Sequence, residues 1–278
     1  MTSIAKVAPV TVFIPTYNRG ALVLSVLEKV RSCDPQPAEI LVHVDAANGT
    51  LECKLRRQFP DVKILTSSTR LGPGGGRHRC LVACNTPYAV SFDDDSYPVD
   101  RDFFSHIEPL FLRHPRAAIF GASIWHRCEA ERPRIEEVVR VAIYTGCGYA
   151  VRLAAYRQVR GTLSLPVAYG MEETDLSIQL FAAGWQIYEA GLLRVLHDTD
   201  SKHHDSFEIT AGAISNVGLF VFLHFPVIRW SSAFCESQTE LLIRFARDGF
   251  AVYSPVSLKF RLFAINIGDL DDRLSGPL

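Results

Sequence analysis

The chain has 278 residues, of which 48% are hydrophobic and 21% are charged. This length and composition predict a folded protein with a substantial core and exclude global disorder. Because 29 Lys and Arg balance 30 Asp and Glu, we also exclude the basic surface of a general nucleic-acid-binding protein and expect no nucleic-acid partner.

Apolar runs alternate with amphipathic stretches through the first half of the chain. The apolar runs, which predict strands, cover residues 10–14, 40–44, 62–65, 88–92 and 117–120. The amphipathic stretches, which predict helices, are residues 21–30, a segment ending near Cys84, and residues 102–112. Strands and helices alternating at this rhythm imply right-handed crossovers and a mostly parallel sheet.

The second half of the chain is less regular. It contains a predicted strand near residues 138–144, a Gly-Cys-Gly break at 146–148, a helix from about Glu172 and a strand near 192–196. We therefore predict an α/β fold of the Rossmann type, with one continuous sheet flanked by helices. The nucleotide-binding half comes first and the variable half second.

The polar residues that stand out follow predicted strands. Ligands of such sheets bind beyond the carboxyl ends of the strands. We expect the following residues to converge on one edge of the sheet: Thr16, Asn18, Asp45, Arg70 and Asp93 to Asp95.

The chain shows no sign of export. Its first ten residues lack a basic segment followed by an apolar run of signal-peptide length. We expect a cytoplasmic protein with reduced thiols. Its seven cysteines, none in a C-x-x-C pair, indicate neither a disulfide framework nor a cysteine-based zinc site, and Cys80 and Cys84 are interpreted as buried packing residues.

The longest apolar stretch, residues 217–228, is too short to span a membrane. It has 12 residues, including His224 and Pro226, whereas a transmembrane helix needs about 20. We interpret it as a core helix. The alternative is an interfacial segment at the inner face of a membrane, because it is rich in Phe and Leu and leads to Arg229 and Trp230.

Three consecutive aspartates, Asp93, Asp94 and Asp95, follow the apolar run 88–92. Mg²⁺ and Mn²⁺ prefer oxygen ligands and bind through one or two carboxylates plus substrate phosphates. Because alternate residues point the same way in extended backbone, Asp93 and Asp95 are expected to face the ligand and Asp94 to face away. The alternative is a solvated turn with no cation.

A second acidic cluster, Glu172, Glu173 and Asp175, begins an amphipathic helix. The helix dipole favours carboxylates in a first turn, which is a purely structural explanation. The functional interpretation is that one carboxylate accepts a proton from an incoming hydroxyl.

Two further segments carry weaker signals. Residues 70–78 (RLGPGGGRH) combine glycines that let backbone approach a ligand with Arg77 and His78, which either meet a phosphate or pair at the surface. Residues 197–205 hold three His and three Asp. There His197 either completes a metal shell begun by Asp95, forms a zinc site with His203 and His204, or lies in a polar loop.

Taken in order, these segments resemble the inverting nucleotide-sugar glycosyltransferases of family 2, which have the GT-A fold. The resemblance covers about residues 9–205. It rests on four matches: residues 12–19 (VFIPTYNR) with the opening strand and loop, 44–45 (VD) with the end of the second strand, 92–95 (FDDD) with the D-x-D motif, and 172–176 (EETDL) followed by Gly184 and Trp185 with the E-D-x-D-L helix.

The resemblance implies a set of site residues. Thr16 and Asp45 would lie against the nucleobase, Asp93 near the ribose, Asp95 on a Mn²⁺ or Mg²⁺ ion shared with Asp93 and His197, and Glu173 at the catalytic base. Asp175 and Glu172 remain alternatives to Glu173, because the family usually has Asp there. The residues expected to bind the donor are Pro15, Thr16, Tyr17, Asn18, Arg19, Asp45, Arg70, Gly76, Arg77, Asp93 and Asp94.

We therefore expect a metal-dependent inverting glycosyltransferase. Its donor would be a nucleoside-diphosphate sugar, UDP by default with dTDP as an alternative, and its acceptor a glycan, lipid-linked or small-molecule hydroxyl. Residues 1–205 would form the glycosyltransferase domain, with a donor half at about 9–125 and an acceptor half at about 126–205. Residues 206–278 would form a C-terminal helical extension. The rival functions are an inactive sugar-nucleotide or glycan-binding module and a nucleotidyltransferase.

Two departures from the family pattern bear on the site. Gln179 stands where the family often has Arg. The glycine-rich stretch resembles a family segment that more often has Asn before the helix, and Arg70 and His78 fill those positions here. Diphosphate contacts from these positions are therefore not implied by the resemblance.

Overall fold

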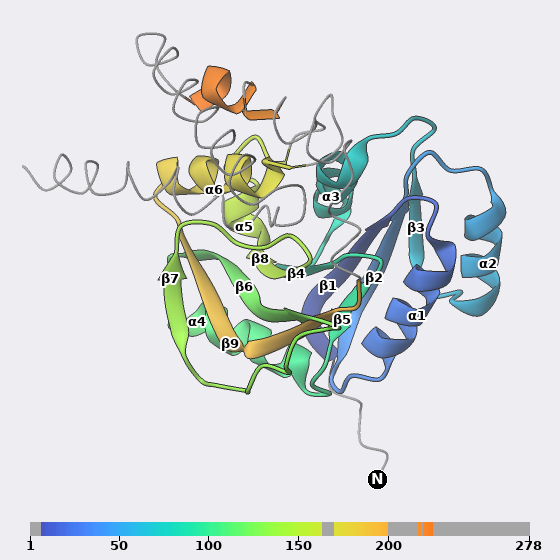
Figure 1. Cartoon of the computed structure of the whole chain (residues 1–278), viewed down its shortest axis with the longest axis horizontal. Helices are drawn as coiled ribbons and strands as arrows, with labels where there is room; N and C mark the ends of the chain where they lie inside the picture. The colour runs from blue at the N-terminus through green and yellow to red at the C-terminus, as the bar shows by residue number, and fades with distance from the viewer. Residues whose placement is uncertain (1–6, 163–169, 200–215, 218, 225–278) are drawn as a thin grey trace, which may run out of the picture.

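The computed structural model describes residues 7–162, 170–199, 216–217 and 219–224. One nine-stranded sheet runs through this part of the chain (Figure 1), with strand order β3-β2-β1-β4-β8-β6-β9-β5 and β7 paired to β9 outside that path. The sheet is flanked by helices, which confirms the predicted α/β architecture.

The first half alternates strands and helices as predicted. Its elements are β1 (Val7–Thr16), α1 (Gly20–Arg31), β2 (Gln36–Val44), α2 (Thr50–Gln58), β3 (Lys63–Thr66), α3 (Gly72–Ala83) and β4 (Tyr88–Phe92). Strands β3, β2, β1 and β4 are mutually parallel. The glycine-rich segment belongs to α3 itself.

The second half adds antiparallel strands. Its elements are β5 (Ser96–Pro98), the 3₁₀ helix η1 (Phe103–His106), α4 (Ile107–Arg113), β6 (Ala117–His126), β7 (Val138–Val141), β8 (Gly148–Arg152), α5 (Leu153–Tyr156), α6 (Glu172–Ala182) and β9 (Gln186–His197). Strand β8 runs antiparallel to both β4 and β6, so it joins the two halves into one sheet.

Successive residues of each strand point to opposite faces of the sheet, and helices cover both faces, so both are buried. Val12 and Ile14 of β1 pack with α1, η1 and α4, whereas Phe13 packs with α3, α5 and α6. Cys80 and Cys84 are fully packed on the α3 side and are free thiols, as predicted. Figure 1 shows α3, α5 and α6 together on one side of the sheet.

Strand pairing brings the predicted site residues to one edge. Strand β1 lies between β2 and β4, so Thr16, Asp45 and the Asp93–Asp95 turn emerge at neighbouring carboxyl ends. Strand β5 pairs antiparallel with β9, which places Ser96 opposite His197.

No helix among the described residues is long and apolar enough to cross a membrane. In the stretch 217–228, Val217, Phe220 and Val221 are buried, in line with a core helix, while Phe222 and Leu223 are exposed. Residues 225–228 lie outside the described part of the chain.

Candidate active site

The Asp93–Asp95 turn is buried at its tip. Asp94 accepts a hydrogen bond from Thr16 Oγ1 at 2.8 Å, and Arg19 bridges Asp94 (3.0 Å) and Asp95 (2.6 Å). The expectation that Asp94 faces away is therefore wrong. The backbone turns here, with Ser96 N bonded to Asp93 O, so the alternation of an extended strand does not apply.

His197 lies beside this turn, as the sequence suggested. Its Nε2 is 3.1 Å from Asp95 Oδ1. Burial lowers the pKa of His197, but its hydrogen bonds to Asp95 and Cys147 outweigh burial and raise the pKa to about 11. Burial raises the pKa of Asp95, but His197 and Arg19 overcome that effect and hold it at about 2. The pair is thus an imidazolium and a carboxylate.

Asp94 differs from Asp95 in its electrostatics. Burial raises its pKa to about 7, against the opposing effects of Arg19 and Thr16. Two adjacent aspartates in one turn therefore have widely separated pKa values, because Asp95 has an imidazolium partner that Asp94 lacks.

Asp93 belongs to a second group of charges centred on Arg77 of α3. Arg77 Nη2 donates to Asp93 Oδ1 at 2.7 Å, and its Nη1 lies 3.5 Å from Glu172 Oε1 and 3.6 Å from Glu173 Oε1. The Arg77 side chain is 4% exposed. From the sequence, Arg77 was expected either to bind a phosphate or to pair at the surface. The burial of its side chain excludes the surface alternative.

Gly146 makes room for this cluster. A Cβ built on Gly146 would overlap Glu173 Oε1 and lie 3.0 Å from Arg77 Nη2. Its carbonyl also accepts from Arg77 Nη2 at 3.3 Å. Glycine is therefore required by close approach, a role that the sequence did not indicate beyond a break between elements.

Asp175 has different partners. Arg160 Nη2 lies 3.0 Å and His224 Nε2 lies 2.6 Å from Asp175 Oδ1, and Gln179 donates to Oδ2 at 2.7 Å. These contacts tie α6 to residues 160 and 224. Gln179, at the position where the family often has Arg, thus bonds within the protein. Of the three acidic candidates, Glu172 and Glu173 approach Arg77.

Asp45 caps the start of α3 from the neighbouring strand. Its carboxylate accepts hydrogen bonds from the Leu71 and Gly72 amides and from Ser67 Oγ, at 2.7 to 3.1 Å. A carboxylate at a helix N-terminus is favoured by the unsatisfied amides and the dipole. This role was not predicted for Asp45.

The remaining predicted donor residues line the β1 and α3 ends. Arg70 lies over the Tyr17 ring, 4.6 Å from its centroid, and Asn18 has a left-handed backbone (φ 55°) that turns the chain into α1. A Cβ on Gly76 would lie 3.2 Å from Pro15 Cβ and 2.9 Å from His43 Nδ1. Gly76 is thus explained by helix packing.

A thiol missed by the sequence analysis joins the site. Donor atoms of Asp93, Cys147 and His197 all lie within 4.8 Å of one another. Cys147 immediately precedes β8, and only its pairing with β4 brings it beside Asp93. Its sequence neighbours give no such signal. His203 and His204, the other ligands of the alternative zinc site, lie outside the described residues.

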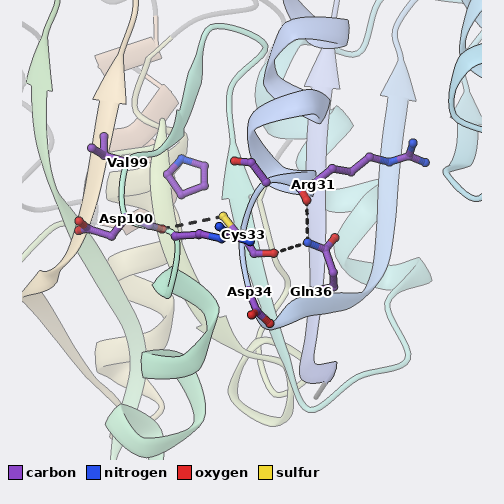
Figure 2. A pocket seen from close by; sticks show the side chains of 9 residues that line it. Arg31, Cys33, Asp34, Gln36, Val99 and Asp100 are labelled. Carbon is purple, nitrogen blue, oxygen red and sulfur yellow. Dashed lines mark hydrogen bonds between the residues drawn. The ribbon is translucent and has the colours of Figure 1, made fainter. Parts of the chain in front are cut away.

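A cavity of about 590 Å³ lies away from these residues. It is formed by the end of α1, the start of β2 and the segment after β5 (Figure 2). None of the predicted site residues lines it. Its lining residues are Arg31, Ser32, Cys33, Asp34, Gln36, Pro98, Val99, Asp100 and Arg101.

Comparison with known proteins shows the family of this chain. Residues 11–151, about half of the chain, match the family model described as Glycosyl transferase family 2. No curated protein sequence matches the chain.

Solved structures share the fold at low sequence identity. GalNAc-T7 with UDP, GalNAc and Mn²⁺ is similar with a TM-score of 0.67 and 13% identity, covering 94% of this chain and 57% of that one. The mannosyltransferase PcManGT of Pyrobaculum calidifontis, with GDP-Man and Mn²⁺, has a TM-score of 0.60 and 14% identity, covering 96% of this chain and 88% of that one. TarS of S. aureus has a TM-score of 0.58 and 14% identity, covering 85% of this chain and 43% of that one. The chain spans less than two thirds of the TarS and GalNAc-T7 chains.

Proposed function

Since the chain belongs to glycosyl transferase family 2, it is a nucleotide-sugar glycosyltransferase, and we propose that it transfers the sugar to a hydroxyl acceptor by single displacement with inversion. The observation that carries this proposal is the Arg77 cluster. One buried guanidinium contacts both Asp93, on the expected donor side, and Glu173, the expected base.

Donor binding is assigned to the edge formed by the ends of β1, β2 and β4. We place the nucleobase near Thr16 and Asp45 and the ribose near Asp93. The Asp45 carboxylate already accepts hydrogen bonds from the backbone amides at the start of α3. Its proposed role is therefore to hold the start of α3 in place, so that a nucleobase can lie against it. UDP remains the default nucleotide, with dTDP as the alternative.

The donor chemistry of the described residues fits a divalent cation. His197 lies within 4.8 Å of an Asp93 carboxylate oxygen and 3.1 Å from Asp95 Oδ1, so an imidazole lies beside both carboxylates. We propose that these three residues would hold Mn²⁺ or Mg²⁺. Such an ion, when bound, would neutralise the charge of the diphosphate leaving group. The GalNAc-T7 and PcManGT structures contain Mn²⁺.

Glu173 is the proposed base. It is 7% exposed at the start of α6 and lies 3.6 Å from Arg77. A buried carboxylate needs a compensating charge, and Arg77 supplies it while leaving the carboxylate able to accept the acceptor's proton. Asp175 is fixed in another direction by the Arg160 guanidinium and the His224 imidazole.

Release of nucleoside diphosphate tests the reaction. The protein is incubated with a panel of nucleotide sugars, Mn²⁺ and hydroxyl acceptors, and the free nucleoside diphosphate is measured. We expect release with at least one donor and acceptor pair. Donor binding without release under any pairing would instead support a binding module, and release of pyrophosphate from a nucleoside triphosphate would support a nucleotidyltransferase.

The acceptor side is proposed to be residues 126–205, with residues 206–278 as an extension. Phe222 is 58% exposed beside buried Phe220. We propose that this extension contacts a membrane surface or a lipid-linked acceptor on the cytoplasmic side. Flotation with liposomes tests it, and a protein that stays wholly in the aqueous fraction would contradict membrane contact.

A further inference from the structure

The cation site contains a sulfur donor. Asp93 follows β4 and Cys147 precedes β8, and the register pairs Phe92 with Gly148, so these two residues leave the sheet side by side. His197 ends β9 and is brought in by its pairing with Ser96. Their donor atoms lie within 4.8 Å of one another.

The surroundings hold Cys147 in place beside the other two donors. Cys147 is buried and forms no disulfide, and its carbonyl accepts from Ser96 Oγ, which fixes its backbone. A cation would displace the second ring proton of the His197 imidazolium and bind at Nδ1, while Nε2–H stays hydrogen-bonded to Asp95. A metal-bound imidazole commonly donates its second N–H to a carboxylate in this way.

We infer that Asp93, Cys147 and His197 form a carboxylate, thiolate and imidazole ligand set that binds Zn²⁺ or Co²⁺ in preference to Mn²⁺ or Mg²⁺. Sulfur and imidazole ligands suit Zn²⁺ and Co²⁺, whereas all-oxygen sets suit Mg²⁺ and Mn²⁺. The inference rests on the proposed function only for the presence of a cation at this position.

Titration with Co²⁺ tests the ligand set without measuring activity. The full chain, freed of metal, is titrated with Co²⁺ and its absorption is followed. We expect a sulfur-to-cobalt charge-transfer band in the near ultraviolet and the strong visible bands of tetrahedral Co²⁺, both displaced by Zn²⁺. Cys147→Ser should abolish the charge-transfer band and weaken Zn²⁺ binding at least about tenfold.

The control is Cys53→Ser, which removes an exposed thiol. It should leave the band unchanged; loss of the band in this variant would assign it to adventitious binding and overturn the inference. If Cys147→Ser does not fold, X-ray absorption of the Zn²⁺-loaded wild type decides the question. A Zn–S distance of about 2.3 Å is expected, and a shell of oxygen and nitrogen only would contradict a thiolate ligand.

The two proposals fail separately. Sugar transfer with Mn²⁺ but no sulfur band would remove the thiolate ligand and leave the glycosyltransferase. A sulfur band that depends on Cys147, with no nucleotide sugar turned over, would remove the proposed reaction and leave the metal site.

Discussion

Arg77 compensates the charge of three acidic side chains that lie close together. Asp93, Glu172 and Glu173 approach one guanidinium whose side chain is 4% exposed. Burial lowers the pKa of Arg77, but Asp93 and the two glutamates outweigh it and hold that pKa well above its ordinary value. A permanent cation therefore connects the Asp93–Asp95 turn with α6.

Removing this cation should destabilise the fold. In Arg77→Met, three carboxylates lose their compensating charge, and breaking a buried ion pair typically costs about 3–5 kcal/mol. Urea denaturation measures the change. Arg127→Met is the control, because Arg127 pairs with Asp198 at an exposed position, and it should unfold at the wild-type urea concentration. Equal midpoints for both variants would mean that Arg77 does not compensate these carboxylates.

Replacing the proposed base should separate binding from chemistry. Glu173→Gln keeps the size of the side chain but cannot accept the acceptor's proton, so turnover should fall by about 10²–10⁴, while calorimetry gives unchanged affinity for the nucleotide. Asp175→Asn is the contrast, because it loses the Arg160 and His224 pairs and should act mainly on stability. If Glu173→Gln keeps most of its turnover, the base is Glu172 or Asp175.

Single residues were predictable where chemistry and chain order agreed. Asp93 to Asp95 and His197 were proposed because carboxylates or imidazole follow predicted strands, and Glu173 was proposed because it begins an amphipathic helix and matches the base position of the family. Cys147 and Gly146 were not, because their roles depend on the pairing of β8 with β4 and on contact with α6. Such long-range contacts leave no local pattern in the sequence.

Among the elements, α3 depends on a residue outside itself. It begins with Gly72 and Pro73 and has glycines at 74, 75 and 76, which are poor helix formers. Asp45, at the end of β2, accepts from the amides of Leu71 and Gly72. Of these glycines, Gly76 allows α3 to pack closely on Pro15 and His43.

Loss of this cap should loosen the start of α3. In Asp45→Asn, an amide NH₂ replaces a carboxylate oxygen facing backbone donors, which should cost about 1–3 kcal/mol. Hydrogen exchange should quicken at residues 71–76, and thermal unfolding should shift downward. Asp61→Asn is the control, since Asp61 is exposed and pairs with Arg31 at the surface. Unchanged exchange at 71–76 would show that Asp45 does not cap the helix.

Elements with strong periodicity were predicted from sequence, and weakly patterned ones were missed. The buried strands β1, β2 and β4 read as continuous apolar runs because both faces are covered. Helix α2 was missed because only Glu52 and Leu55 are buried in it. Strand β8 was missed because its five residues follow a glycine break.

At the scale of the whole molecule, β8 holds the two halves together. It lies between β4 of the first half and β6 of the second, antiparallel to both. The parallel order of the first half followed from the alternation of strands and helices. The antiparallel insertion did not, because no connection length or turn motif specifies which strands β8 separates.

The pH dependence of unfolding belongs to the whole molecule, and His43 makes one contribution to it whose sign is definite. His43 is fully buried in β2, and both its ring nitrogens lack a hydrogen-bond partner within the described part of the chain. Burial lowers its pKa, opposed by Asp45 and assisted by Arg79. The folded protein thus binds this proton less readily than the unfolded chain, whose His has a pKa near 6.5.

The folded state with neutral His43 is not penalised well above pH 6.5, where the unfolded chain also has a neutral His43. Stability is lost as the pH falls through about 6.5 towards the pKa of His43 in the folded state, because only the unfolded chain then binds the proton readily. Asp94 and His197, whose pKa values are raised, act in the opposite direction but do so in both proteins. As the pH falls from about 7.5 to 5.5, the free energy of unfolding of the wild type should therefore fall more, or rise less, than that of His43→Asn, which does not titrate at this position. Urea denaturation at several pH values measures both slopes. The variant has a lower stability throughout because it leaves a cavity, so only the slopes are compared. Equal slopes would mean that His43 becomes protonated in the folded state as easily as in the unfolded one.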